Sequence, residues 1–76
     1  MQAYILIQTE IGRSAKVARE TSALPGVESS EVLTGGYDVI TKVTAADVDE
    51  LGRLVAEGIQ AVEGITRTVT CPVIHL

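Results

Sequence analysis

Two adjacent glycines, Gly35 and Gly36, constrain the fold of this chain more than any other feature. Glycine adopts positive φ at no steric cost, so the pair predicts a two-residue primed turn, whose twist matches the strands that it joins. The segments on either side, Val27 to Leu33 and Tyr37 to Thr44, have the length of paired strands. The sequence therefore predicts a central β-hairpin, with a polar edge strand before the turn and a buried strand after it.

This hairpin joins two halves of the chain that follow the same order, strand, helix, strand, when one strand of the hairpin is counted in each half. Before it, Ala3 to Thr9 is apolar on both faces, as is typical of a central strand, and a helix is expected over Arg13 to Ala23, ending at Pro25-Gly26. After it, a second helix begins near Asp47, which has Glu50 at capping-box spacing, and ends at Glu63-Gly64. A last strand is expected over Ile65 to Ile74.

This order predicts an α+β fold: a ferredoxin-like βαββαβ chain whose right-handed crossovers give a four-stranded antiparallel sheet in the order 4-1-3-2. Both helices then cover one face, and the inner strands leave apolar groups beside threonines on the other. Such a patch is larger than monomers usually expose, so we expect two sheets to pack face to face in a homodimer of the dimeric α/β-barrel type. Simple alternation puts Ile65 on the same face as Val69 and Cys71, and Val27 on the same face as Ser29.

Composition limits the functions open to the chain. Its 76 residues predict one domain over 1–76, with an aliphatic core because there is no Trp or Phe. A net charge of -4 and scattered cations argue against direct contact with nucleic acid, and no apolar run reaches the roughly 20 residues that span a membrane. We therefore expect a cytoplasmic protein. No residue set points to a metal, a cofactor or catalysis, and the single Cys71 is interpreted as a small buried hydrophobe.

Three segments in this order resemble a known family, and together they extend over nearly the whole chain. They are Leu24-Pro25-Gly26-Val27, Gly36-Tyr37-Asp38-Val39-Ile40, and Thr66-Arg67-Thr68-Val69-Thr70 with Val73-Ile74. The pattern resembles the C-terminal ligand-sensing (RAM) domain of the Lrp/AsnC, or feast/famine, transcription regulators. The usual N-terminal helix-turn-helix is not in this sequence, so the chain looks like a stand-alone sensing domain, a known variant of the family.

The resemblance implies dimers formed by apposed sheets and arranged in rings, with an amino-acid effector site between neighbouring dimers near the central turn. It also implies that a full-length Lrp/AsnC regulator is a possible partner through which the domain modulates transcription. Carried over residue by residue, the family's positions give six candidate ligand-binding residues: Gly35, Gly36, Tyr37, Asp38, Thr68 and Thr70.

The chemistry of these residues suits an amino acid. Asp38 offers a charged acceptor for an ammonium group, backbone N–H groups at the glycine turn face a carboxylate, and threonine hydroxyls serve either group. Five of the six residues also have a purely structural interpretation. The glycines form a hairpin turn, Asp38 caps it, and Thr68 and Thr70 are good strand formers.

Three alternatives to a sensor of this family remain open. One is a small cofactor-free dimeric enzyme of the monooxygenase or isomerase type, although the single His75 and the scarcity of aromatic residues argue against it. Turnover abolished by a change at Tyr37 or Asp38 would favour this enzyme. The second is an assembly protein with no ligand. The third is an amino-acid sensor of the ACT type, whose function would be nearly the same.

Overall fold

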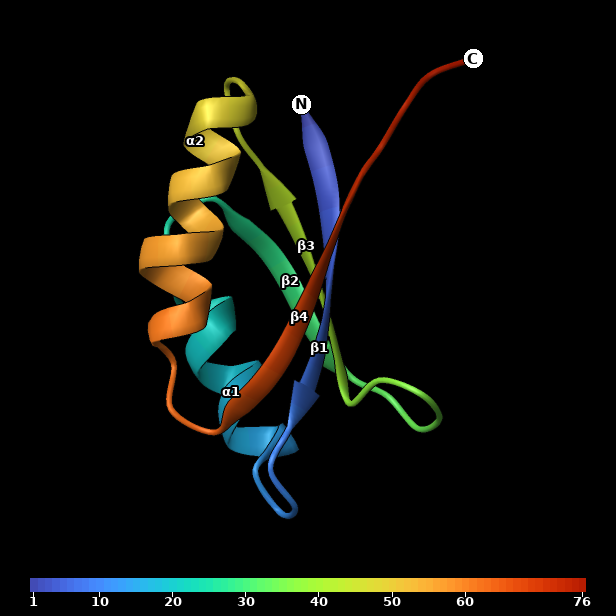
Figure 1. Cartoon of the computed structure of the whole chain (residues 1–76), viewed down its shortest axis with the longest axis vertical. Helices are drawn as coiled ribbons and strands as arrows, with labels where there is room; N and C mark the ends of the chain where they lie inside the picture. Colours follow the sequence, from blue (N-terminus) through green and yellow to red (C-terminus); the bar gives the residue numbers. More distant parts are fainter.

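Four strands and two helical stretches follow one another in the order βαββαβ, and the computed structural model describes all residues 1–76 (Figure 1). The elements are β1 (Gln2–Thr9), α1 (Ser14–Ser22), β2 (Val27–Val32), β3 (Val39–Thr44), α2 (Val48–Arg53), η1 (Leu54–Gly58), η2 (Ile59–Ala61) and β4 (Ile65–Pro72). All neighbouring strands are antiparallel, in the order β2-β3-β1-β4. The predicted ferredoxin-like fold and strand order are confirmed. No helix is both long and apolar enough to cross a membrane.

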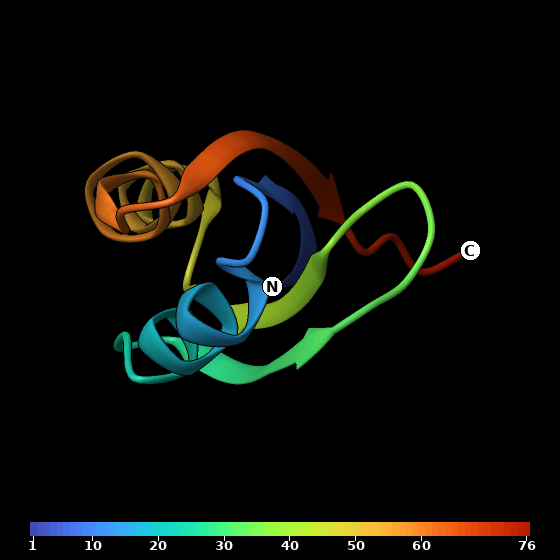
Figure 2. The same ribbon diagram turned by 90° about the horizontal axis from the view of Figure 1, so that it is seen from below.

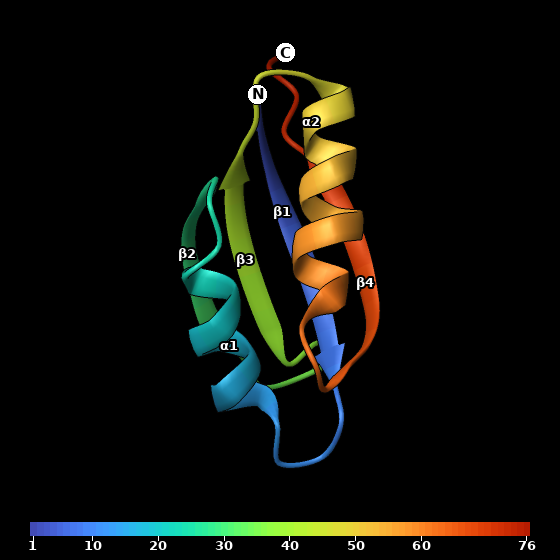
Figure 3. The ribbon, with the colours of Figure 1, turned by 90° about the vertical axis from the view of Figure 1, so that its left-hand side faces the viewer.

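Both helical stretches cover the same face of the sheet, and the core lies between them (Figure 3). The core is aliphatic, as composition predicts, and β1 and β3 supply its centre with side chains that alternate toward the helices. Its ten buried residues are Ala3, Ile5, Ile7, Val17, Ala18, Val39, Val43, Ala45, Leu51 and Ile59. The opposite face carries no helix and is called the bare face below.

The second helical stretch begins as expected but is not one regular α-helix. Asp47 is its N-cap, because Oδ1 of Asp47 accepts a hydrogen bond of 2.8 Å from the N–H of Glu50. The Glu50 carboxylate accepts in turn from the N–H of Ala46, one residue before the cap. After Arg53 the backbone continues as a π-helical turn, η1, and then as a 3₁₀ turn, η2. We call the whole of 48–61 the second helical stretch.

Two β-bulges make simple alternation wrong at the ends of the edge strands. The register shifts between Val27 and Ser29 in β2, and in β4 Ile65 pairs with Thr9 while Arg67 pairs with Gln8. The extra residue in each strand reverses which face the preceding side chain occupies. Val27 and Ile65 therefore pack against the core instead of sharing a face with Ser29 and Val69.

The connection between β2 and β3 also differs from the predicted two-residue turn. Val32 pairs with Val39, so six residues, 33–38, form the loop, and the N–H of Leu33 donates to the carbonyl of Asp38 at 2.8 Å. Only Gly35 of the glycine pair has positive φ, at 117°. A two-residue type I′ turn needs positive φ at both central residues, so this loop is longer and wider.

A chain of hydroxyl groups joins α1 to the two strands beneath it. Oγ of Ser30 lies 2.8 Å from Oγ1 of Thr21 and 2.9 Å from Oγ1 of Thr41, and Oγ1 of Thr21 donates to the carbonyl of Val17. Thr21 and Thr41 are fully buried. The network satisfies every hydroxyl that the core encloses, as burial of polar groups requires.

The two edges of the sheet are both irregular. Just after β4, the N–H of Val73 donates to the carbonyl of Gln2. Because ladder bonds alternate along antiparallel strands, the backbone groups of Thr68 and Thr70 point outward. Pro72 occupies the next outward position and has no N–H to offer there. The edge formed by β2 carries the bulge at Glu28.

Candidate functional site

The β2–β3 loop, residues 33–38, brings four of the six predicted site residues together: Gly35, Gly36, Tyr37 and Asp38. The loop extends beyond the bare face, away from the helices, and so does the C-terminal segment after β4 (Figure 2). Gly35 and Gly36 are exposed, and Tyr37 and Asp38 are half-buried. The loop therefore presents its backbone and one carboxylate to whatever lies beside the sheet.

Asp38 anchors this loop to the end of β1. Its Oδ2 accepts from the N–H of Thr9 at 2.8 Å, and its own N–H donates to the carbonyl of Ile7 at 2.9 Å. The side chain of Gln8 adds a third contact, since Nε2 donates to the carbonyl of Gly36 at 3.0 Å. The one salt bridge of the chain joins Lys16 to Glu20, so the charge of Asp38 has no cationic partner within the chain.

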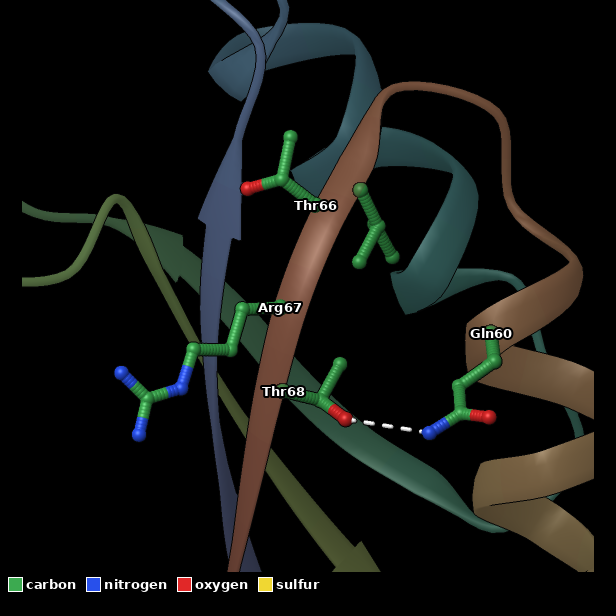
Figure 4. A pocket seen from close by; sticks show the side chains of 5 residues that line it. Gln60, Thr66, Arg67 and Thr68 are labelled. Carbon is green, nitrogen blue, oxygen red and sulfur yellow. Dashed lines mark hydrogen bonds between the residues drawn. The ribbon is translucent and has the colours of Figure 1, made fainter.

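The other two predicted site residues, Thr68 and Thr70, lie on the opposite face of the sheet. In the β1–β4 register Thr68 faces Ile7 and Thr70 faces Ile5, and both isoleucines are buried under the helices. Oγ1 of Thr68 accepts from Nε2 of Gln60 at 3.2 Å, a contact that Figure 4 shows. A single copy of the chain therefore does not bring Asp38 and the threonines into one site.

A small polar hollow of about 200 Å³ surrounds Thr68. Its lining consists of Gln60, Ile65, Thr66, Arg67 and Thr68. Figure 4 shows the side chain of Arg67 on the other side of β4, directed away from Gln60. The Thr68 hydroxyl and the Gln60 amide, and not the Arg67 guanidinium, are thus the polar groups on the helix side of this hollow. Sequence reasoning missed Gln60, because its pairing with Thr68 depends on how the second helical stretch lies against β4.

A larger hollow of about 370 Å³ separates the second helical stretch from β4, and we call it the α2–β4 groove. It is mostly apolar, and its lining includes Val48, Gly52, Val55, Ala56, Thr70 and Pro72. Val48 is 69% exposed because the groove leaves it uncovered. Thr70 therefore borders an apolar space, and Thr68 borders a polar one.

The bare face of the sheet carries an apolar patch made by Tyr4, Leu6, Ile40, Val69 and Cys71. Threonine was expected beside these groups, but Thr41 of β3 is buried under the helices, and Thr68 and Thr70 of β4 lie on the helix side of the sheet. Cys71 was expected to be buried and is exposed instead, because it pairs with Tyr4 and shares its outward face. Nζ of Lys42 lies 6.0 Å from the centre of the Tyr4 ring.

Acidic, His and Cys side chains do not gather in groups of three or more that could hold a metal ion.

This chain is similar to known proteins over nearly its full length. A model of the Lrp/AsnC ligand-binding domain matches residues 2–75. An uncharacterized HTH-type transcriptional regulator of Pyrococcus furiosus is 34% identical over 71 residues, which are 90% of this chain and 47% of that protein. The chain thus spans about half the length of the curated regulators that it matches. A homocitrate synthase of Sulfurisphaera tokodaii is 41% identical over 54 residues, which are 71% of this chain and 12% of that enzyme.

Solved structures share the fold. A crystal structure of a Thermus thermophilus protein has a TM-score of 0.91 at 32% identity, over 99% of this chain and 94% of that one. Escherichia coli AsnC has a TM-score of 0.90 at 22% identity, over 99% and 51% of the two chains. A transcriptional regulator of Neisseria meningitidis, solved in complex with L-Met, has a TM-score of 0.83 at 20% identity, over 97% of this chain and 49% of that one.

Proposed function

The chain belongs to the Lrp/AsnC family as one of its ligand-binding domains, and from this we infer that it senses an amino acid or a related small metabolite. The observation that carries the proposal is the match of the ligand-binding model over residues 2–75. The Neisseria regulator of the same fold, solved in complex with L-Met, supports an amino acid as the ligand class.

The geometry of the six candidate residues supports a site that is completed between copies of the chain. The β2–β3 loop, which ends at Asp38, extends beyond the bare face (Figure 2), and Thr68 and Thr70 lie on the helix side. We propose that the loop of one copy meets the threonine side of β4 in a neighbouring copy. Asp38 would then accept from the ligand ammonium group, and threonine hydroxyls would donate to its carboxylate.

Assembly is the second part of the proposal, and the bare face supports it. The patch of Tyr4, Leu6, Ile40, Val69 and Cys71 is apolar and has no cover within the chain. Burial of such a face against a second copy stabilises both, at roughly 25 cal/mol for each Å² of apolar surface removed from water. We propose a homodimer through this face, with dimers arranged in a ring by the contacts that complete the ligand site.

The output of the sensor requires a partner. Since the curated relatives are HTH-type transcriptional regulators, we propose that the domain modulates transcription by assembling with a full-length Lrp/AsnC regulator. A second candidate partner is a metabolic enzyme, because a homocitrate synthase contains a 54-residue stretch that is 41% identical to this chain. Co-purification of the tagged domain from its own cells, followed by mass spectrometry, separates the two.

Thermal unfolding against a panel of the twenty amino acids tests the sensing function. A ligand present at 100 times its dissociation constant stabilises the folded state by about 2.7 kcal/mol. For a domain of this size each kcal/mol raises the unfolding midpoint by about 4 to 8 °C. A selective rise with one or a few amino acids supports the proposal. A flat panel, repeated with other small metabolites, would overturn it and favour the assembly or enzyme alternatives.

A further inference from the structure

We propose that the ligand is an amino acid with an uncharged, apolar side chain, and that this side chain occupies the α2–β4 groove. The inference rests on the proposed function, and it adds the class of amino acid and the surface that selects it. Three features support it: the groove itself, the polar hollow beside it, and the absence of charge in the groove lining.

The α2–β4 groove is an apolar surface that the fold leaves open. Val48, Val55 and Pro72 face it, and no charged residue lines it. Gly52 widens it, since a Cβ added there would meet nothing within 4 Å. Its volume of about 370 Å³ is at the lower end of the range of about 300 to 1,000 Å³ for ligand pockets, as a small ligand requires.

The backbone beside the groove is irregular, which is independent support for a functional role. The turn that supplies Val55 and Ala56, η1, is π-helical over Leu54–Gly58. Single π-helical turns are rare within helices and frequently occur at functional sites. Here the wider turn lies directly against the groove.

The polar hollow around Thr68 lies beside the groove on the same strand. Thr68 lines the hollow and Thr70 lines the groove, so their Cα atoms are two positions apart, about 7 Å along the strand. The outward backbone groups of Thr68 and Thr70 supply N–H donors for a carboxylate and C=O acceptors for an ammonium group. The side chain of Gln60 adds an amide at the polar end. A polar head at Thr68 thus places a side chain of leucine or methionine length in the groove.

Charged side chains would be rejected by the groove. A carboxylate or ammonium group there would lose water and find no partner of opposite charge among the lining residues. Arg67 is the nearest cation on β4, and its side chain is directed to the other face (Figure 4). Discrimination between leucine and glutamate or lysine therefore follows from the lining alone.

Isothermal titration calorimetry of the whole chain with leucine, methionine, glutamate and lysine tests the inference. We expect leucine or methionine to bind at least about tenfold more tightly than the charged pair, which corresponds to about 1.4 kcal/mol or more. Gly52→Leu fills the groove from a position with open space, and should weaken leucine binding by at least about tenfold. Ala56→Leu, on the next helical turn, provides a second filling variant. Arg53→Leu adds the same side chain outside the groove lining and should bind leucine as the parent does.

Every outcome of these measurements either supports or overturns the inference. Weaker leucine binding in either folded filling variant, with Arg53→Leu unchanged, supports the groove as the side-chain site. If the parent binds a charged amino acid best, or if both filling variants bind leucine normally, the inference is overturned and the sensing function stands. If sedimentation shows that Gly52→Leu and Ala56→Leu both lower the mass of the assembly, their weaker leucine binding comes from lost contacts between copies, and the inference is overturned. If no amino acid binds the parent chain, the sensing function falls together with it.

Discussion

Oδ2 of Asp38 accepts a hydrogen bond of 2.8 Å from the backbone N–H of Thr9, a residue 29 positions earlier in the chain. The contact fixes the β2–β3 loop to the end of β1 and uses one carboxylate oxygen. The negative charge is not neutralised by a cation of the same chain. Asp38 therefore combines an anchoring role, which any acceptor can perform, with a charge that only a carboxylate supplies.

Asp38→Asn and Asp38→Ala should separate these two roles. Asparagine keeps an acceptor for Thr9, so its unfolding midpoint should stay near that of the parent, but the ligand-induced rise should disappear. Alanine should also lose about 1 to 2 kcal/mol of stability, because the N–H of Thr9 loses its charged acceptor. Thermal unfolding with and without the amino acid measures both effects. An asparagine variant that still responds to the ligand would show that the charge does not hold it.

Leu6→Arg should convert the proposed dimer to a monomer. Leu6 lies on β1, an inner strand of the sheet, and faces the bare side, where a guanidinium between two apolar sheets would lose water without gaining a partner. Sedimentation velocity measures the change in mass. Ala23→Arg puts the same charge on an exposed residue after α1 and should leave the mass unchanged. A Leu6→Arg variant with the parent mass would rule out the bare face as the interface.

Thr41→Val should destabilise the monomer fold by about 1 kcal/mol, because it removes one hydroxyl from the buried chain and leaves that of Ser30 with one partner fewer. The shape of the side chain is preserved, so packing changes little. The expected fall in the unfolding midpoint is about 4 to 8 °C. Ser22→Ala, which removes an exposed hydroxyl, is the control and should change stability by less than about 0.5 kcal/mol. Equal effects of the two changes would argue against any special contribution of the buried network.

Asp47→Ala should cost about 1 kcal/mol, since the N–H of Glu50 loses its capping acceptor at the start of the second helical stretch. Asp47→Ser restores an acceptor and should recover most of the loss. Urea denaturation gives both values from the midpoint at an unchanged slope. If serine were no better than alanine, the effect would come from the charge of Asp47 and not from the cap.

Most of the fold could be predicted from the periodic patterns in the sequence. The strand order, the aliphatic core and the cap at Asp47 follow from alternation, the 3.6-residue period and one local motif. The bulges at Glu28 and Thr66 do not, because one extra residue in a strand leaves no mark on composition and yet reverses the face of Val27 and Ile65. The six-residue loop was not predicted for a related reason, because a glycine pair permits a tight turn but does not require one.

The candidate site was predictable only in part. The loop residues from Gly35 to Asp38 are contiguous, so any fold brings them together. Whether Thr68 faces the helices depends on its pairing with Ile7, which no local pattern encodes. The groove and the polar hollow depend on how far the second helical stretch lies from β4, a property of packing between segments distant in sequence.

The irregular edges of the sheet affect how this chain can aggregate. A regular edge is a template onto which further strands add without limit, and such addition leads to fibres. Here Pro72 interrupts the donors along β4, and the bulge at Glu28 distorts the row along β2. The addition of further strands in the plane of the sheet is therefore obstructed at both edges. Copies that meet through the bare face, as proposed above, would instead form closed particles of fixed size.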